Sequence, residues 1–136
     1  LVAYLHGIKL HASTGCDAMA ALLNSGLIRI YTVGSGVPAT VDTAISDQVL
    51  LAELTFGATA FGAAVNGVAT ANAITGDPSA NNTGAASFFR LLTSGGAARF
   101  QGLCGLAASD LNLNSLDIQT GATVDITSLT ITESLG

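Results

Sequence analysis

The feature that most constrains this chain is a period-two alternation of side chains, which begins near residue 27 and recurs in short runs. The clearest run is VLLAELTF, residues 49–56, in which Glu53 and Thr55 interrupt a series of apolar positions. Successive side chains of an extended strand point to opposite faces, so this run predicts a strand with one buried face and one wet face. Gly, Pro, Asn and Asp separate the runs, as they commonly do between strands.

About seven short strands of this kind are predicted. They cover residues 27–33, 49–56, 67–75, 85–92, 97–105, 108–121 and 122–133. The SGG turn at 94–96 is expected to join two of them into a hairpin, and Phe88 and Phe89 must face opposite sides of their strand. In the last run the apolar phase shifts, which predicts a bulge near Thr127 or Ser128. Many short strands separated by turns indicate an all-β fold, either an antiparallel β-sandwich or a jelly-roll-like barrel.

One short N-terminal helix is predicted ahead of the strands, at about residues 14–25. Ser13 or Thr14 can accept hydrogen bonds from its first turn, and Gly26 is placed to end it in the left-handed conformation. Its apolar side chains recur on one stripe, as in a helix that packs on one side. Residues 1–12 are expected to form an N-terminal arm, and residues 13–136 a single β domain that includes the helix.

Charged side chains are scarce, with 4 Lys and Arg against 9 Asp and Glu in 136 residues, for a net charge of −5. The cations are Lys9, Arg29, Arg90 and Arg99. This balance argues against nucleic acid as a partner, because a nucleic-acid binder needs a basic surface that displaces counterions from phosphates. A surface so poor in charge is expected where other subunits cover it, so a homo-oligomer is predicted.

No membrane partner is predicted. No uninterrupted apolar run approaches the roughly 20 residues that a membrane-spanning helix needs. The segment LVAYLHGIKLHAS at residues 1–13 is interrupted by His6, Gly7, Lys9 and His11. It also lacks the charged region and the long apolar core of a signal peptide.

No metal site is predicted. His6 and His11 are the only histidines, and both belong to the predicted arm. A zinc site needs further His, Cys or carboxylate ligands at short spacing, and the step from His11 to Cys16 matches no such pattern. Cys16 and Cys104 are too few for a disulfide framework and are expected to be reduced thiols. A bridge between them stays open as an alternative, provided that their Cα atoms lie within about 7 Å.

No catalytic or cofactor motif is predicted either. The chain lacks the G-x-S-x-G motif of a nucleophile elbow, and a Ser-His-Asp triad would have to recruit a histidine from the arm. The VGSGV segment at residues 33–37 has too few glycines for a dinucleotide fingerprint. The protein is therefore expected not to be an enzyme and to bind no cofactor.

Two polar segments carry the Asp and Asn side chains that a calcium or glycan site would need: GDPSANNTG at 76–84 and SDLNLNSLD at 109–117. Neither has the glycine and terminal glutamate of an EF-hand loop, and a chain with no Trp and two Tyr offers little for stacking sugars. Asp77, Pro78 and Asn81 suit a turn, so 76–84 is predicted to connect two strands. Alternate Asp and Asn residues in 109–117 are predicted to form a solvated face of a strand.

The order of segments from Ala20 to Thr132 is more specific than any single motif. A short helix leads to LIRIYTV. Next in order are PATVDTAI, LLAELTF, AFG, GVATANAIT and TGAASFFR, and the series ends with SDLNLNSLDIQTGATVDITSLTIT. This order resembles small virion proteins of tailed bacteriophages. Two features depart from the pattern: Val33 follows IYT where the family often has glycine, and residues 1–16 match nothing in it.

The resemblance implies a non-enzymatic structural protein of the virion, assembled in the host cytoplasm. The leading hypothesis is a capsid decoration or cement protein that stabilises the assembled head, with the major capsid protein or other virion proteins as partners. Strand edges and the arm would add to a neighbouring subunit by backbone pairing. The alternatives are a tail, neck or fibre-adaptor protein, a host-surface glycan-binding module and, as an enzyme, a cell-wall hydrolase.

Overall fold

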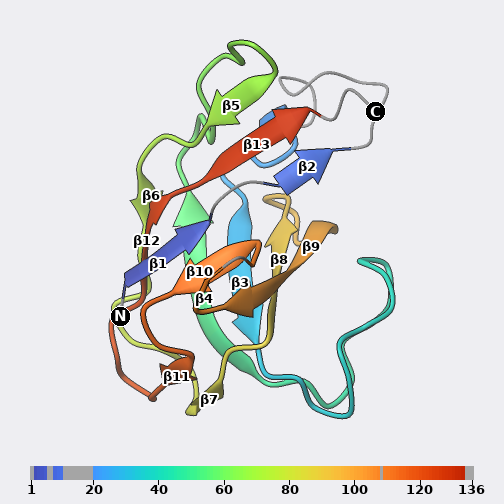
Figure 1. Cartoon of the computed structure of the whole chain (residues 1–136), viewed down its shortest axis with the longest axis vertical. Helices are drawn as coiled ribbons and strands as arrows, with labels where there is room; N and C mark the ends of the chain where they lie inside the picture. Colours follow the sequence, from blue (N-terminus) through green and yellow to red (C-terminus); the bar gives the residue numbers. More distant parts are fainter. Residues whose placement is uncertain (1, 6–7, 11–19, 108, 134–136) are drawn as a thin grey trace.

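The computed structural model describes residues 2–5, 8–10, 20–107 and 109–133 of the chain. The regular secondary structure of the described part consists almost entirely of strands, which Figure 1 shows with their labels. The strands are β1 (Val2–Leu5), β2 (Ile8–Leu10), β3 (Leu27–Tyr31), β4 (Leu50–Phe56), β5 (Val68–Thr70), β6 (Ile74–Thr75), β7 (Gly84–Ala85), β8 (Phe88–Leu92), β9 (Ala98–Gly105), β10 (Leu111–Leu113), β11 (Asp117–Ile118), β12 (Asp125–Ser128) and β13 (Thr130–Glu133). The prediction of an all-β fold is confirmed.

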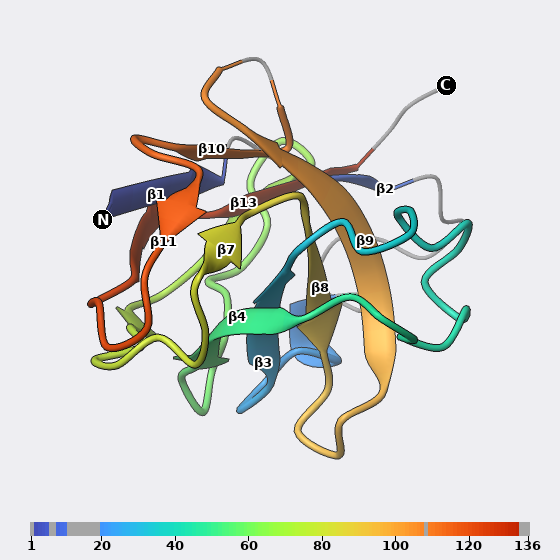
Figure 2. The same ribbon diagram turned by 90° about the horizontal axis from the view of Figure 1, so that it is seen from below.

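Most strands belong to one eight-stranded sheet with the order β12-β1-β10-β9-β8-β3-β4-β6. A three-stranded sheet, β2-β13-β5, and the pair β11-β7 complete the described part. The large sheet curls, as Figure 2 shows from below, and its two edges are joined by a backbone bridge between Asp77 and Val124. Each of these residues donates its N–H to the other's carbonyl oxygen at 2.8 Å.

The sheets are mixed rather than purely antiparallel, so the prediction of antiparallel pairing is wrong in part. Strand β1 runs parallel to β12, β2 parallel to β13, and β9 parallel to β10. A tight hairpin turn imposes antiparallel pairing on the strands that it joins, but no such turn links β1 or β2 to strands more than a hundred residues away. The direction of those pairs could not be read from turn residues.

The centre of the large sheet agrees with the predicted strands. Strand β4 pairs with β3, β3 with β8 and β8 with β9, all antiparallel, and the SGG turn joins β8 to β9 as the expected hairpin. Phe88 and Phe89 do face opposite sides, and both are fully buried. Phe89 packs in the main apolar core, whereas Phe88 stacks on Tyr31 with ring centroids 5.1 Å apart.

Two of the predicted strands are each divided between two sheets. The run 67–75 becomes β5 and β6, and the run 122–133 becomes β12 and β13. The two breaks lie side by side, because the Ala71 N–H donates to the Leu129 carbonyl at 2.8 Å. The predicted bulge near Thr127 or Ser128 is confirmed, because Ala3 of β1 opposes Ile126 and Tyr4 opposes Ser128, so the pairing skips Thr127. Just beyond this bulge, at Leu129, the chain passes from one sheet to the other.

The predicted helix at 14–25 lies largely outside the described residues. Within them, Ala20 and Ala21 have helical backbone and a turn follows. The left-handed residue is Ser25, with φ of 56°, and not Gly26 as predicted. Glycine is needed at 26 for a different reason: a Cβ there would collide with the carbonyl oxygen of Leu92.

The described residues of the predicted arm, 1–12, form strands that pair within the two larger sheets. Strand β1 lies between β10 and β12, and β2 lies against β13. These pairings place the start of the described chain beside its last strands.

The predicted connection 76–84 links β6 to β7 and covers the edge of β4 that faces away from β3. The Asp77 carboxylate accepts a hydrogen bond from the Glu53 N–H at 2.9 Å, and the Asn81 N–H donates to the Leu51 carbonyl at 2.7 Å. The Asn82 side chain donates to the carbonyl of Leu50 at 2.8 Å. An open strand edge invites pairing with another chain, and this segment satisfies the edge from within the protein.

Candidate arginine-lined site

A row of polar side chains crosses the outer face of the large sheet, opposite the apolar core. Directly opposite residues of neighbouring strands share a face, and the register places Glu53, Arg29, Arg90 and Gln101 in line across β4, β3, β8 and β9. Each arginine is the central residue of a five-residue apolar strand. The inward-facing neighbours of these residues pack in the core, so the arginines necessarily point outward.

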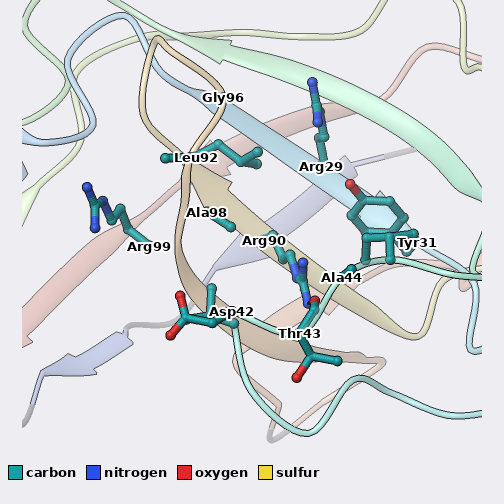
Figure 3. A pocket seen from close by; sticks show the side chains of 13 residues that line it. Arg29, Tyr31, Asp42, Thr43, Ala44, Arg90, Leu92, Gly96, Ala98 and Arg99 are labelled. Atoms are coloured by element: carbon teal, nitrogen blue, oxygen red, sulfur yellow. Dashed lines mark hydrogen bonds between the residues drawn. The ribbon is translucent and has the colours of Figure 1, made fainter.

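A cavity of about 360 Å³ lies over this row (Figure 3). Residues 41–45, from the connection between β3 and β4, and residues 96–99, from the turn into β9, form its walls. All three arginines of the chain, Arg29, Arg90 and Arg99, line it. Figure 3 shows the three side chains spread along the cavity rather than converging on one point. A protein with a net charge of −5 thus gathers most of its positive charge in one place.

Arg29 forms an ion pair with Glu53, with 2.7 Å between Nε and Oε2. Both side chains are about one-third exposed. Partial burial alone lowers the pKa of Arg29, but hydrogen bonds to Glu53 and Tyr31, together with the negative charge of Glu53, outweigh burial and raise the pKa. Arg29 therefore stays charged and is largely neutralised by its neighbour.

Arg90 is 5 % exposed and holds the connection over the sheet. Its Nε donates to the Gln101 side chain at 2.9 Å, and its Nη2 donates to the carbonyl of Thr43 at 2.6 Å and more weakly to that of Thr40 at 3.3 Å. Gln101 in turn donates to the Pro38 carbonyl at 2.8 Å. Burying a charge is costly unless hydrogen bonds replace its water, and the carbonyls of the connection supply that replacement.

The connection itself, residues 32–49, is held by its own polar contacts. Gln48 is buried and donates to the Gly36 carbonyl at 2.6 Å, while its side-chain oxygen accepts the Ser46 N–H at 2.9 Å. Hydrogen bonds from the backbone and the hydroxyl of Ser35 lower the pKa of the exposed Asp47 carboxyl. We call this segment the 32–49 loop, and these contacts give the cavity a built wall.

Arg99 and Asp42 lie on the rim of the cavity, and both are exposed. Neither side chain forms a hydrogen bond or an ion pair with any residue that the structure describes. Arg29 and Arg90, beneath them, stand directly opposite each other on β3 and β8, an arrangement of like charges that is unfavourable by itself. The site offers positive charge and hydrogen-bond donors, which suit the oxygen atoms of an anion.

Of the histidines and cysteines that could serve metal or redox chemistry, the structure describes only Cys104, which does not line this cavity. His6, His11 and Cys16 lie outside the described residues. Cys104 is a free, partly exposed thiol on β9, and burial, with a smaller effect from Asp110, raises its pKa to about 12. Among the residues that the structure describes, no three His, Cys, Asp or Glu side chains gather as a metal site, and no helix is long and apolar enough to cross a membrane.

The second polar segment, 109–117, was predicted to be a solvated face, which is wrong for Asn112. That side chain is 4 % exposed, and its oxygen accepts the Ser109 N–H at 3.0 Å. Asp110 accepts the Leu103 N–H at 3.1 Å. The whole of β10 is buried between β1 and β9, so its asparagine is a structural residue.

Comparison with known proteins assigns no family, because the chain matches no protein-family model, no curated protein and no solved structure.

The arginine cluster was not predicted from the sequence. The available signal was a lone arginine at the centre of two apolar strands, LIRIY and FFRLL. Only the register of β3 against β8 shows that the two arginines meet.

Proposed function

We propose that this protein is a non-enzymatic structural protein of a phage virion, and specifically a capsid decoration or cement protein that stabilises the assembled head. The order of segments described above supports the proposal, and one property of the surface carries it. Large apolar side chains are exposed on a chain that has few charges to keep its surface wet. They are Leu22, Val33, Val37, Val49, Val65, Leu103 and Leu106.

The strongest candidates for contact are Leu103 and Leu106, which are 52 % and 62 % exposed near the end of β9. The register places Leu103 directly beside Phe88, on the face that also carries Tyr31 and the arginine row. Complete burial of a fully exposed large apolar side chain contributes about 1.5–3 kcal/mol to the free energy of association. Each of these two half-exposed leucines would contribute part of that amount on contact with a partner.

The mechanism is burial of apolar and small-residue surface, with no chemical step. The partners are the major capsid protein or other virion proteins, and the protein itself acts as a homo-oligomer in the virion after assembly in the host cytoplasm. Within this proposal the curled sheet belongs to the β-sandwich or jelly-roll-like class.

Electron microscopy and mass spectrometry of particles of the phage that encodes the chain test the proposal. We expect density on the head surface and a copy number in the hundreds per particle. Density confined to the tail or neck would move the protein to the tail, neck or fibre-adaptor class. A few copies per particle together with specific binding on a glycan array would replace the proposal with a host-surface module.

A matched pair of variants tests the apolar surface. Replacing both Leu103 and Leu106 by Ser is expected to weaken binding to heads that lack the protein by at least tenfold. Val65→Ser removes an equally exposed apolar side chain, 68 % exposed, at a distant turn and should leave binding unchanged. Equal binding by both variants would refute the role of the β9 leucines.

A further inference from the structure

The charges around the arginine-lined cavity do not balance. Three arginines line it, while Glu53 and Asp42 are the carboxylates beside them. One positive charge therefore remains without a counter-charge. The uncompensated charge is that of Arg90, because Glu53 neutralises Arg29, Asp42 shares the rim with Arg99, and the carbonyls of the 32–49 loop solvate Arg90 without cancelling its charge. The donors that remain free lie at the Arg99 end, since the Arg99 side chain has no partner among the described residues.

We propose that this end of the cavity binds a single carboxylate, supplied by an acidic side chain of a neighbouring virion protein. The source of the carboxylate rests on the proposed function, whereas the carboxylate site rests on the cavity alone. The guanidinium of Arg99 provides two parallel N–H donors that match the two oxygens of a carboxylate. The buried charge of Arg90 adds to the attraction from below.

The cavity favours one negative charge over two. Asp42 stands on the same rim as Arg99 and repels any anion that binds there. A dianion such as phosphate is repelled more strongly than a carboxylate, which carries half its charge. The size of the cavity, about 360 Å³, is at the lower end of the range for small-molecule pockets and suits a single side chain. The rest of the chain is acidic, which directs an acidic partner to this one positive opening.

Three variants that change exposed side chains test the carboxylate site with the intact protein. Binding of a blocked peptide with one central glutamate is measured by NMR titration or calorimetry at low salt. Arg99→Gln should weaken binding about five- to tenfold, and Asp42→Asn should strengthen it by a similar factor. Asp117→Asn alters the net charge by the same amount on β11, away from the cavity, and should have no effect.

The outcomes separate the two parts of the proposal. Equal effects of Asp42→Asn and Asp117→Asn would reduce the result to net charge and overturn the site. Tighter binding of inorganic phosphate than of the glutamate peptide, or no binding of the peptide, would overturn it as well. If Arg99→Gln weakens peptide binding but leaves head binding unchanged, the carboxylate site stands and its proposed source is wrong. Loss of both in Arg99→Gln supports the proposal in full.

Discussion

Arg90→Met removes the guanidinium that holds the 32–49 loop against the sheet while keeping a long apolar stem. The wild-type side chain makes two short hydrogen bonds, 2.6 Å to Thr43 and 2.9 Å to Gln101, and one long bond of 3.3 Å to Thr40. Methionine can fill most of the space but can donate to none of these acceptors. The carbonyl oxygens of the loop would then lose their partner on the sheet.

The cost follows from the number and type of these bonds. A hydrogen bond with a charged partner contributes about 1.5–3 kcal/mol, so the two short bonds together are worth about 3–6 kcal/mol. Two effects reduce this sum: the variant no longer buries a charge, and the repulsion from Arg29 across the strands disappears, which returns about 0.2–1 kcal/mol. The net expectation is a loss of about 2–4 kcal/mol in the free energy of unfolding.

Urea unfolding at a fixed protein concentration measures this loss. The slope for small proteins is about 1–3 kcal/mol per molar urea, so the midpoint should fall by about 1 M or more with the slope unchanged. Hydrogen exchange should rise selectively in residues 32–49. Arg99→Met is the matched control, since its exposed arginine has no partner among the described residues and should change stability by about 0.5 kcal/mol or less. Equal midpoints for the two variants would refute the anchoring role of Arg90.

Three further predictions follow from other buried or strained positions. Asp77→Ala removes the carboxylate that accepts hydrogen bonds from the N–H groups of Glu53 and Ser79 and leaves both donors without a partner. The free energy of unfolding should therefore fall by about 2–3 kcal/mol in the same urea assay. A change below about 0.5 kcal/mol would contradict the edge-covering role. Ser25→Gly removes the strain of a left-handed non-glycine residue and should raise the melting temperature by an amount equivalent to about 0.5–1 kcal/mol of stability. Gly26→Ala places a Cβ against the Leu92 carbonyl oxygen and should lower the melting temperature. The reverse order would contradict the assignment of the turn. The third prediction concerns Cys104 in a Cys16→Ser background, where the rise in its pKa from 9.0 to about 12 lowers the thiolate fraction at pH 8 about a thousandfold. Disulfide reagents should therefore react far more slowly with the native protein than with the protein unfolded in urea, and the native rate should keep rising above pH 9. Similar native and unfolded rates at pH 8 would contradict the raised pKa.

The elements that could be predicted are those whose pattern is local. Strand β4 and the β8–β9 hairpin follow from alternation and from turn residues, which act over a few positions. The bulge at Thr127 could be predicted from the phase of the apolar residues, but the changes of sheet inside 67–75 and 122–133 could not, because each depends on the other through a contact between Ala71 and Leu129. A segment that crosses between sheets keeps its alternation, and the alternation does not say which sheet it joins.

The candidate site could not be predicted for the same reason. Arg29 and Arg90 lie on strands separated by β4, β5, β6 and β7 in the chain, and their meeting depends on the register of β3 against β8. Composition indicated few cations and so argued against a basic surface. It does not show where those cations lie, and a small number of charges on one sheet face can still produce a local positive site.

The pairing of β1 and β2 with β10, β12 and β13 sets the order in which the sheets can be completed. The first described strands find partners only after residues beyond 110 are present, although β3, β4, β8 and β9 can pair earlier. Contacts between such distant residues require the closure of a long loop before any pairing compensates for it, and chains rich in them fold slowly. During synthesis, the residues of β1 and β2 would wait unpaired for the last strands, and that interval is when a second copy of the chain could capture them.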